Sequence, residues 1–227
     1  MDFSAVQVWG DSILKGVIFN VERGRYSILK QNALSIIGEK LGIELVNKSR
    51  MGRTAPEALE TMKGESGDMT NTAVVIELGG NDCDFDWAEV AARPEDEHVC
   101  KTPSQKFTSS LEGIINLVRS RSGIPIICTL PPLDAKRYFN WITRDGLSRE
   151  NILKYICVPE RIYRWQEYYS LLAMRVAARM KCDCLPIREA ILERLRGEDI
   201  WCVDGIHLNQ TGHDMMADAV IRAAQGV

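Results

Sequence analysis

The chain of 227 residues contains only three histidines and no long hydrophobic run, and each shortage disfavours a class of function. Three histidines without a shared motif give little support for a metal centre, so we expect no metal. Nowhere do about 18 apolar residues follow one another, so we expect no membrane-spanning helix. The first residues, MDFSAVQVWGDS, lack a basic segment followed by an apolar run. We therefore expect a cytoplasmic protein without a signal peptide.

A strong charge of either sign is also lacking. The 28 Lys and Arg residues nearly balance the 31 Asp and Glu residues, which leaves a net charge of −3. Such a balance disfavours nucleic acid or an anionic membrane as a partner. No stretch rich in Gly or Pro separates two halves, and no repeat is visible. We therefore expect a single domain over residues 1–227.

The seven cysteines are an odd number in a chain too large to need disulfides, which predicts reduced thiols. Cys182 and Cys184 form a Cys-x-Cys motif, but no second pair follows with the spacing of a zinc site.

Short apolar runs alternate with segments of helical periodicity along most of the sequence. This alternation predicts an α/β fold with a mainly parallel sheet, because parallel neighbours require long crossover connections. Ligand sites in such folds lie at the carboxyl ends of the strands. The expected strands are residues 5–9, 43–46, 72–78, 124–130 and 182–187, and the expected helices are 27–41, a short one after residue 54, 107–120, 162–176 and 211–224.

Two segments interrupt the alternation. Residues 83–107 read as a long irregular loop, and loops of this length in compact domains are more often functional than not. Residues 133–160 have aromatic side chains without a long periodic run, which fits either a lid or a surface excursion that packs its own aromatics. Both segments are expected near a substrate pocket, for which the candidate residues are Phe85, Trp87, Tyr138, Phe139 and Trp141.

A serine follows the first predicted strand in the sequence Gly10-Asp11-Ser12, where a helix could begin. On its own this tripeptide is most simply a helix cap. However, Asp204 and His207 follow the last strand, and a serine hydroxyl needs a base such as histidine to attack an ester. A carboxylate three residues before the histidine can hold the imidazole in its useful tautomer.

Donors for a developing oxyanion are also present at strand ends. They are the backbone N–H groups of Ser12 and Gly52 and the side-chain amide of Asn81. Each position also has a purely structural interpretation, as a turn glycine or a loop amide. Asp11 and Asp82, beside these positions, are interpreted as hydrogen-bonding ties between loops. For His213 we expect a structural role.

Four blocks together resemble the SGNH, or GDSL-type, hydrolases: Val-Trp-Gly-Asp-Ser, the glycine after the second strand, Gly-Gly-Asn-Asp, and Asp-Gly-Ile-His. The resemblance extends from Gly10 to His213, with Ile13 where a leucine often follows the serine. It implies a flavodoxin-like three-layer sandwich around a parallel five-stranded sheet and no cofactor. It also implies that Ser12 is the nucleophile, that His207 and Asp204 are the base and its orienting carboxylate, and that Ser12, Gly52 and Asn81 form the oxyanion hole.

The resulting hypothesis is a serine esterase that forms an acyl-enzyme on a small-molecule ester, for example an acetylated carbohydrate. A lysophospholipase, a thioesterase or an acyltransferase would use the same residues. A non-catalytic carbohydrate-binding module is disfavoured by the complete set of Ser12, Asn81, Asp204 and His207. The motifs do not specify the oligomeric state.

Overall fold

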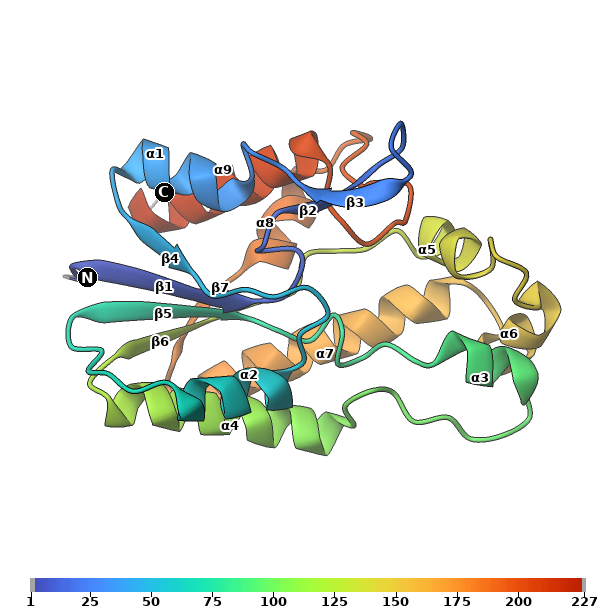
Figure 1. Cartoon of the computed structure of the whole chain (residues 1–227), viewed down its shortest axis with the longest axis horizontal. Coiled ribbons are helices and arrows are strands. Elements are labelled where there is room, and N and C mark those ends of the chain that lie inside the picture. Colours follow the sequence, from blue (N-terminus) through green and yellow to red (C-terminus); the bar gives the residue numbers. More distant parts are fainter. Residues whose placement is uncertain (1–2, 226–227) are drawn as a thin grey trace.

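The fold is built on a parallel sheet whose strands point the same way, as Figure 1 shows for the computed structural model, which describes residues 3–225. The strand order is β4-β1-β5-β6-β7, and every neighbouring pair is parallel. The predicted α/β fold with a five-stranded parallel sheet is therefore confirmed. The strands are β1 (Ala5–Gly10), β4 (Leu45–Asn47), β5 (Thr72–Glu77), β6 (Ile124–Cys128) and β7 (Asp183–Leu185).

Helices cover both faces of this sheet, which makes three layers (Figure 1). One cluster of buried apolar residues, including Trp9, Ile76 and Phe107, lies on one face, and a second, including Val8 and Ile37, lies on the other. The first face is covered by α2 (Ala55–Gly64), α4 (Ser104–Ser120) and α7 (Glu160–Arg179), and the second by α1 (Ala33–Leu41), α8 (Ile187–Arg194) and α9 (Gln210–Gln225).

The central strand β5 shows how the sequence produces two buried faces. Its β-branched and small residues are suited to a strand covered on both sides. Alternation along the strand directs Val74 and Ile76 to one cluster, whereas Ala73 and Val75 pack in the other. Glu77 ends the strand and is buried with 2% of its surface exposed.

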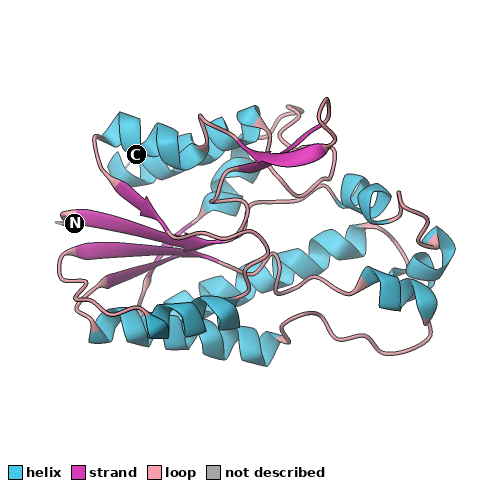
Figure 2. Ribbon diagram, in the orientation of Figure 1, coloured by secondary structure: helices cyan, strands magenta, loops and turns pink. Residues whose placement is uncertain are grey.

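A third apolar cluster lies beyond the carboxyl ends of the strands, where three short helices gather (Figure 2). They are α3 (Trp87–Ala92), α5 (Ala135–Ile142) and α6 (Arg149–Ile156). The expectation that segment 83–107 is irregular throughout is thus wrong, because it contains α3 and the start of α4. Helices of about two turns give too little periodicity to be recognised, and here each begins at a side-chain cap, namely Asp86, Asp134 and Ser148.

The segment after Ser12 also differs from the prediction. Residues 12–16 form turns rather than a helix, and an antiparallel hairpin follows, made of β2 (Val17–Asn20) and β3 (Arg25–Ile28). Phe19 and Tyr26 pair across it with ring centroids 5.2 Å apart. The helix expected from residue 27 begins only at Ala33, because the Asn32 side chain accepts hydrogen bonds from the N–H groups of Leu34 and Ser35.

His213 joins α9 to α1, as expected for a structural histidine. Its Nδ1 accepts a hydrogen bond from the Ala33 N–H at 3.3 Å, and 1% of the residue is exposed. Burial lowers the pKa of this imidazole to about 4. In the unfolded chain a histidine takes up its proton near pH 6.5.

Acidification is therefore expected to destabilise the fold through His213. Between pH 6.5 and 4 the unfolded chain binds the extra proton, so the stability present above pH 6.5 is lost as the pH falls, by about 2 kcal/mol at pH 5. Urea unfolding at pH 7 and pH 5 gives the loss in free energy of unfolding between the two pH values, which is expected to be smaller in His213→Asn than in wild type. His98→Asn is the control and should lose as much as wild type. An equal loss of stability in wild type and His213→Asn would contradict this assignment.

Candidate active site

Ser12, His207 and Asp204 lie in one hydrogen-bonded chain at the carboxyl edge of the sheet. The Ser12 Oγ is 2.9 Å from the His207 Nε2, and the His207 Nδ1 is 2.7 Å from the Asp204 Oδ2. Ser12 stands in the turn after β1, whereas Asp204 and His207 stand in the loop between α8 and α9. All three side chains are buried. This geometry lets the imidazole remove a proton from the hydroxyl.

The turn from Asp204 to His207 fixes the carboxylate. Its Oδ1 accepts hydrogen bonds from the N–H groups of Ile206 and His207, each at 3.0 Å. Gly205 has a φ of +73°, and a Cβ there would lie 2.5 Å from the Asp134 carbonyl oxygen, so only glycine fits. Burial by itself raises the pKa of Asp204, but the hydrogen bonds and charge of His207 outweigh it and hold the pKa below its usual value.

Tyr26 covers the imidazole from the β2–β3 hairpin. Its ring centroid lies 5.1 Å from that of His207, and burial together with the nearby Asp204 charge raises its pKa to about 12. On its other side the hairpin meets Trp141, whose ring is 4.6 Å from Phe19. This contact could not be expected from the sequence, because the hairpin itself was not predicted.

The three expected oxyanion donors border the same cavity as Ser12 and His207. The Asn81 Nδ2 donates to the Asp11 Oδ2 at 2.9 Å, which orients the amide and leaves its second N–H for a ligand. Within residues 3–225, the backbone N–H groups of Ser12 and Gly52 form no hydrogen bond. Gly52 has a φ of +76°, so its turn favours glycine.

Buried carboxyl groups tie these loops together, as predicted. Asp11 accepts a hydrogen bond from the Ile13 N–H at 2.8 Å, and Asp82 accepts from the Ala55 N–H at the start of α2, at 3.0 and 3.1 Å to its two oxygens. Burial raises the pKa of both Asp11 and Asp82 to about 6. The loops that carry Ser12 and Asn81 are thus held to each other and to α2.

The cavity over Ser12 has a volume of about 250 Å³, and five of its lining residues are Phe, Tyr or Trp. Three of the predicted substrate residues, Phe85, Trp87 and Tyr138, line it. The other two do not, because Phe139 is buried in the cluster of α3, α5 and α6, and Trp141 packs on the hairpin. The wall also includes residues that were not predicted as part of the pocket, among them Tyr155, Trp165 and Gln166. Tyr155 was seen only as one aromatic of segment 133–160, and the other two fall in the long predicted helix.

Most polar groups of these walls are already paired inside the protein. Trp87 Nε1 and Tyr138 OH both donate to the Asp84 Oδ1, at 2.9 and 2.7 Å. Trp165 Nε1 donates to the Cys83 carbonyl at 2.9 Å. These three side chains therefore offer a ligand mainly apolar ring surface, whereas donors lie beside Ser12 and on Arg161, which also lines the cavity.

Gln166 adds a further polar group with a fixed direction. Its Oε1 accepts a hydrogen bond from the buried Arg188, and its Nε2 donates to the Pro131 carbonyl at 2.8 Å. Because a guanidinium can only donate, the amide oxygen must face Arg188. One N–H of Gln166 is left over in the cavity wall.

No group of three or more His, Cys, Asp or Glu side chains within residues 3–225 is arranged to hold a metal ion. In the same part of the chain, every helix is too short or too polar to cross a bilayer.

A parallel α/β sheet with Ser, His and Asp joined at its carboxyl edge is an arrangement found in serine hydrolases. The sequence profile described as the GDSL-like lipase/acylhydrolase family matches residues 8–215. The chain belongs to this family and is a carboxylic ester hydrolase. No curated protein sequence matches it significantly.

Solved structures share the fold at low sequence identity. A lipase/acylhydrolase from Enterococcus faecalis is 17% identical with a TM-score of 0.62, covering 98% of this chain and 96% of its own. A member of the lipolytic G-D-S-L family from Veillonella parvula is 14% identical with a TM-score of 0.65, covering 98% and 99%. A mutant acetyl-xylooligosaccharide esterase from a Geobacillus species is 17% identical with a TM-score of 0.62, covering 98% and 95%.

Proposed function

We propose that this hydrolase is a serine esterase that cleaves a short-chain acyl ester, such as an acetyl ester, of a carbohydrate or other small molecule. The observation that carries the proposal is the hydrogen-bonded chain from the Ser12 Oγ through His207 to Asp204. It supports Ser12 as the nucleophile, His207 as the base and Asp204 as the carboxylate that orients the imidazole.

The reaction proceeds in two halves. The Ser12 Oγ attacks the ester carbonyl while His207 Nε2 takes the hydroxyl proton, and the oxyanion is held by the N–H groups of Ser12, Gly52 and Asn81. The intermediate collapses, the carbon–oxygen bond to the alcohol breaks, and His207 gives its proton to the leaving oxygen. Water then attacks the acyl-enzyme with His207 as base, which releases the acid and restores Ser12.

The preference for a short acyl group rests on the cavity beside Ser12. Its volume of about 250 Å³ suits a small ester, and the faces of Phe85, Trp87 and Tyr138 offer stacking surfaces for a sugar ring. A relative in fold is described as an acetyl-xylooligosaccharide esterase. A lysophospholipase or thioesterase would prefer long acyl chains, and an acyltransferase would pass the acyl group to an alcohol in place of water.

A fluorophosphonate probe and a panel of p-nitrophenyl esters test this proposal. We expect the probe to modify Ser12, identified by peptide mass spectrometry, and not to react with Ser12→Ala. Acetyl and butyryl esters are expected to give a kcat/KM at least tenfold above that of the decanoyl ester. Labelling that persists in Ser12→Ala would contradict the nucleophile. A higher kcat/KM for decanoyl esters would indicate a lipase or thioesterase, and acyl transfer to added sugar would indicate a transferase.

A further inference from the structure

A second cavity lies on the opposite face of the sheet from α4 and α7, between the strands and helices α1 and α9. Its volume is about 290 Å³, slightly more than that of the cavity over Ser12. Twenty of its lining residues are apolar, and Glu77 is the one charged or polar residue among them. We call it the sheet–helix cavity. Apolar cavities of about 150 Å³ already bind small hydrocarbons in place of water.

The cavity lies over the whole sheet, because its lining includes residues of all five strands, from Leu45 of β4 to Leu185 of β7. Ala73, Val75 and Glu77 line it from one face of β5, and the sheet register places Val6 beside Ala73 and Val8 beside Val75. Residues 73 to 77 advance about 13 Å along a strand. This path along β1 and β5, which we call the channel, is long enough for one extended alkyl chain.

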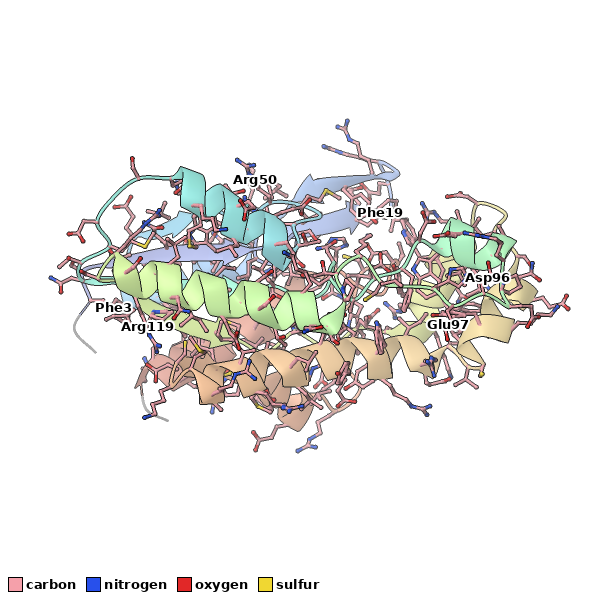
Figure 3. All side chains as sticks on the ribbon, turned by 90° about the horizontal axis from the view of Figure 1, so that it is seen from below. Phe3, Phe19, Arg50, Asp96, Glu97 and Arg119 are labelled. Atoms are coloured by element: carbon pink, nitrogen blue, oxygen red, sulfur yellow. The ribbon has the colours of Figure 1, made fainter. Side chains whose placement is uncertain are left out.

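One end of the channel lies at the amino-terminal edge of the sheet. There the lining residues are Phe3 and Leu41, which are half-buried, and Ala223 and Ala224, which are exposed. Figure 1 shows the ends of α1 and α9 together at this edge, and Figure 3 places Phe3 at the end of the molecule away from Asp96 and Glu97. Among residues 3–225, this end of the channel is the one nearest to solvent, and it lies on the side opposite the catalytic edge.

Glu77 closes the inner end. It lies at the carboxyl end of β5 and borders both cavities. Its Oε2 is fully enclosed and forms no hydrogen bond to any residue in the described part of the chain. Burial, together with the charges of Asp11 and Asp82, raises the pKa of Glu77 well above its usual value, which favours the neutral carboxylic acid.

A buried carboxyl without a partner costs about 1 to 3 kcal/mol, and a ligand group that hydrogen-bonds to it recovers part of this. A neutral carboxyl is both donor and acceptor, as is a hydroxyl. An ionised head group would instead have to cross an apolar channel and leave water without a counter-charge. An uncharged alcohol is thus the best match for this end of the cavity.

We propose that the sheet–helix cavity binds a single-chain aliphatic alcohol, with its hydroxyl on Glu77 and its chain along β1 and β5 toward Phe3. The site is separate from the esterase reaction, since Ser12, His207 and Asn81 line only the other cavity.

Thermal unfolding and calorimetry with n-octanol test the proposal on the whole chain. We expect saturable, one-to-one binding that raises the Tm of wild type, and binding of n-octane at least fivefold weaker. Ala73→Ile places a larger side chain inside the channel and is expected to weaken n-octanol binding at least tenfold. Ala178→Ile, the same change at an exposed position of α7, is the control and should bind like wild type. Val220→Phe fills the channel from α9 in case Ala73→Ile folds poorly.

Glu77 variants test the position of the hydroxyl. In Glu77→Met the preference for n-octanol over n-octane is expected to fall below twofold, and in Glu77→Gln, which still donates and accepts, it should persist. The proposal is overturned if n-octanol fails to bind, or if well-folded Ala73→Ile and Val220→Phe bind it like wild type, because the alcohol would then occupy another site. An unchanged preference in Glu77→Met overturns the orientation.

Discussion

Replacing Ser12 by alanine is expected to lower kcat for p-nitrophenyl acetate by about 10⁶-fold, the loss seen when the nucleophile of a serine hydrolase is removed. The hydroxyl at 2.9 Å from the His207 Nε2 is the group that this substitution deletes. Without it no acyl-enzyme forms, and the residual rate comes from water in a cavity that still holds the oxyanion donors. Initial rates at saturating substrate, divided by the enzyme concentration from ultraviolet absorbance, give the value of kcat.

The control for this prediction is Ser109→Ala, the same change at an exposed position of α4. It should retain the wild-type rate. Circular dichroism and the Tm show whether Ser12→Ala keeps the fold, which is expected because the Ser12 hydroxyl forms a hydrogen bond only with His207 among the described residues. If Ser12→Ala hydrolysed the ester within tenfold of wild type, Ser12 would not be the nucleophile.

The sheet was predictable because its strands are short apolar runs that end at turn residues. The residues of β5, Thr-Ala-Val-Val-Ile-Glu, are mostly β-branched or apolar, and both faces of the strand are buried. This composition is typical of a central strand in a parallel sheet. The short helices α3, α5 and α6 and the β2–β3 hairpin were not predictable in this way. Their stability comes from contacts between distant segments, such as Phe19 with Trp141, which local periodicity does not encode.

The polar core of the site followed from sequence, whereas the walls of the cavity did not. Ser12, Asn81 and His207 each follow a strand or belong to a recognisable block, and the edge of the sheet brings them together. The wall residues Tyr155 and Trp165 come from α6 and α7, and their direction depends on how these helices pack. The aromatic composition of segment 133–160 predicted a pocket, but it did not distinguish Tyr138, which lines the cavity, from Phe139, which is buried behind it.

Asp204→Asn is expected to lower kcat by about 10⁴-fold at neutral pH, while KM changes little. The two backbone N–H groups at the Asp204 Oδ1 can be satisfied only by an oxygen, so the asparagine must keep its carbonyl there. Its NH₂ group then faces the His207 Nδ1, which in wild type lies 2.7 Å from a carboxylate oxygen. The imidazole is forced to accept at Nδ1 and to carry its proton on Nε2, where it can no longer take the proton of Ser12.

The control is Asp199→Asn, the same change at a carboxylate that pairs with Arg137 outside the cavity. It should leave kcat unchanged. Because Asp204→Asn retains both backbone hydrogen bonds of the turn, its Tm is expected to remain close to that of wild type, whereas Asp204→Ala loses them and should melt earlier. A kcat for Asp204→Asn within tenfold of wild type would show that the tautomer of His207 is set by another group, and Tyr26, 5.1 Å from the imidazole, would be the next side chain to replace.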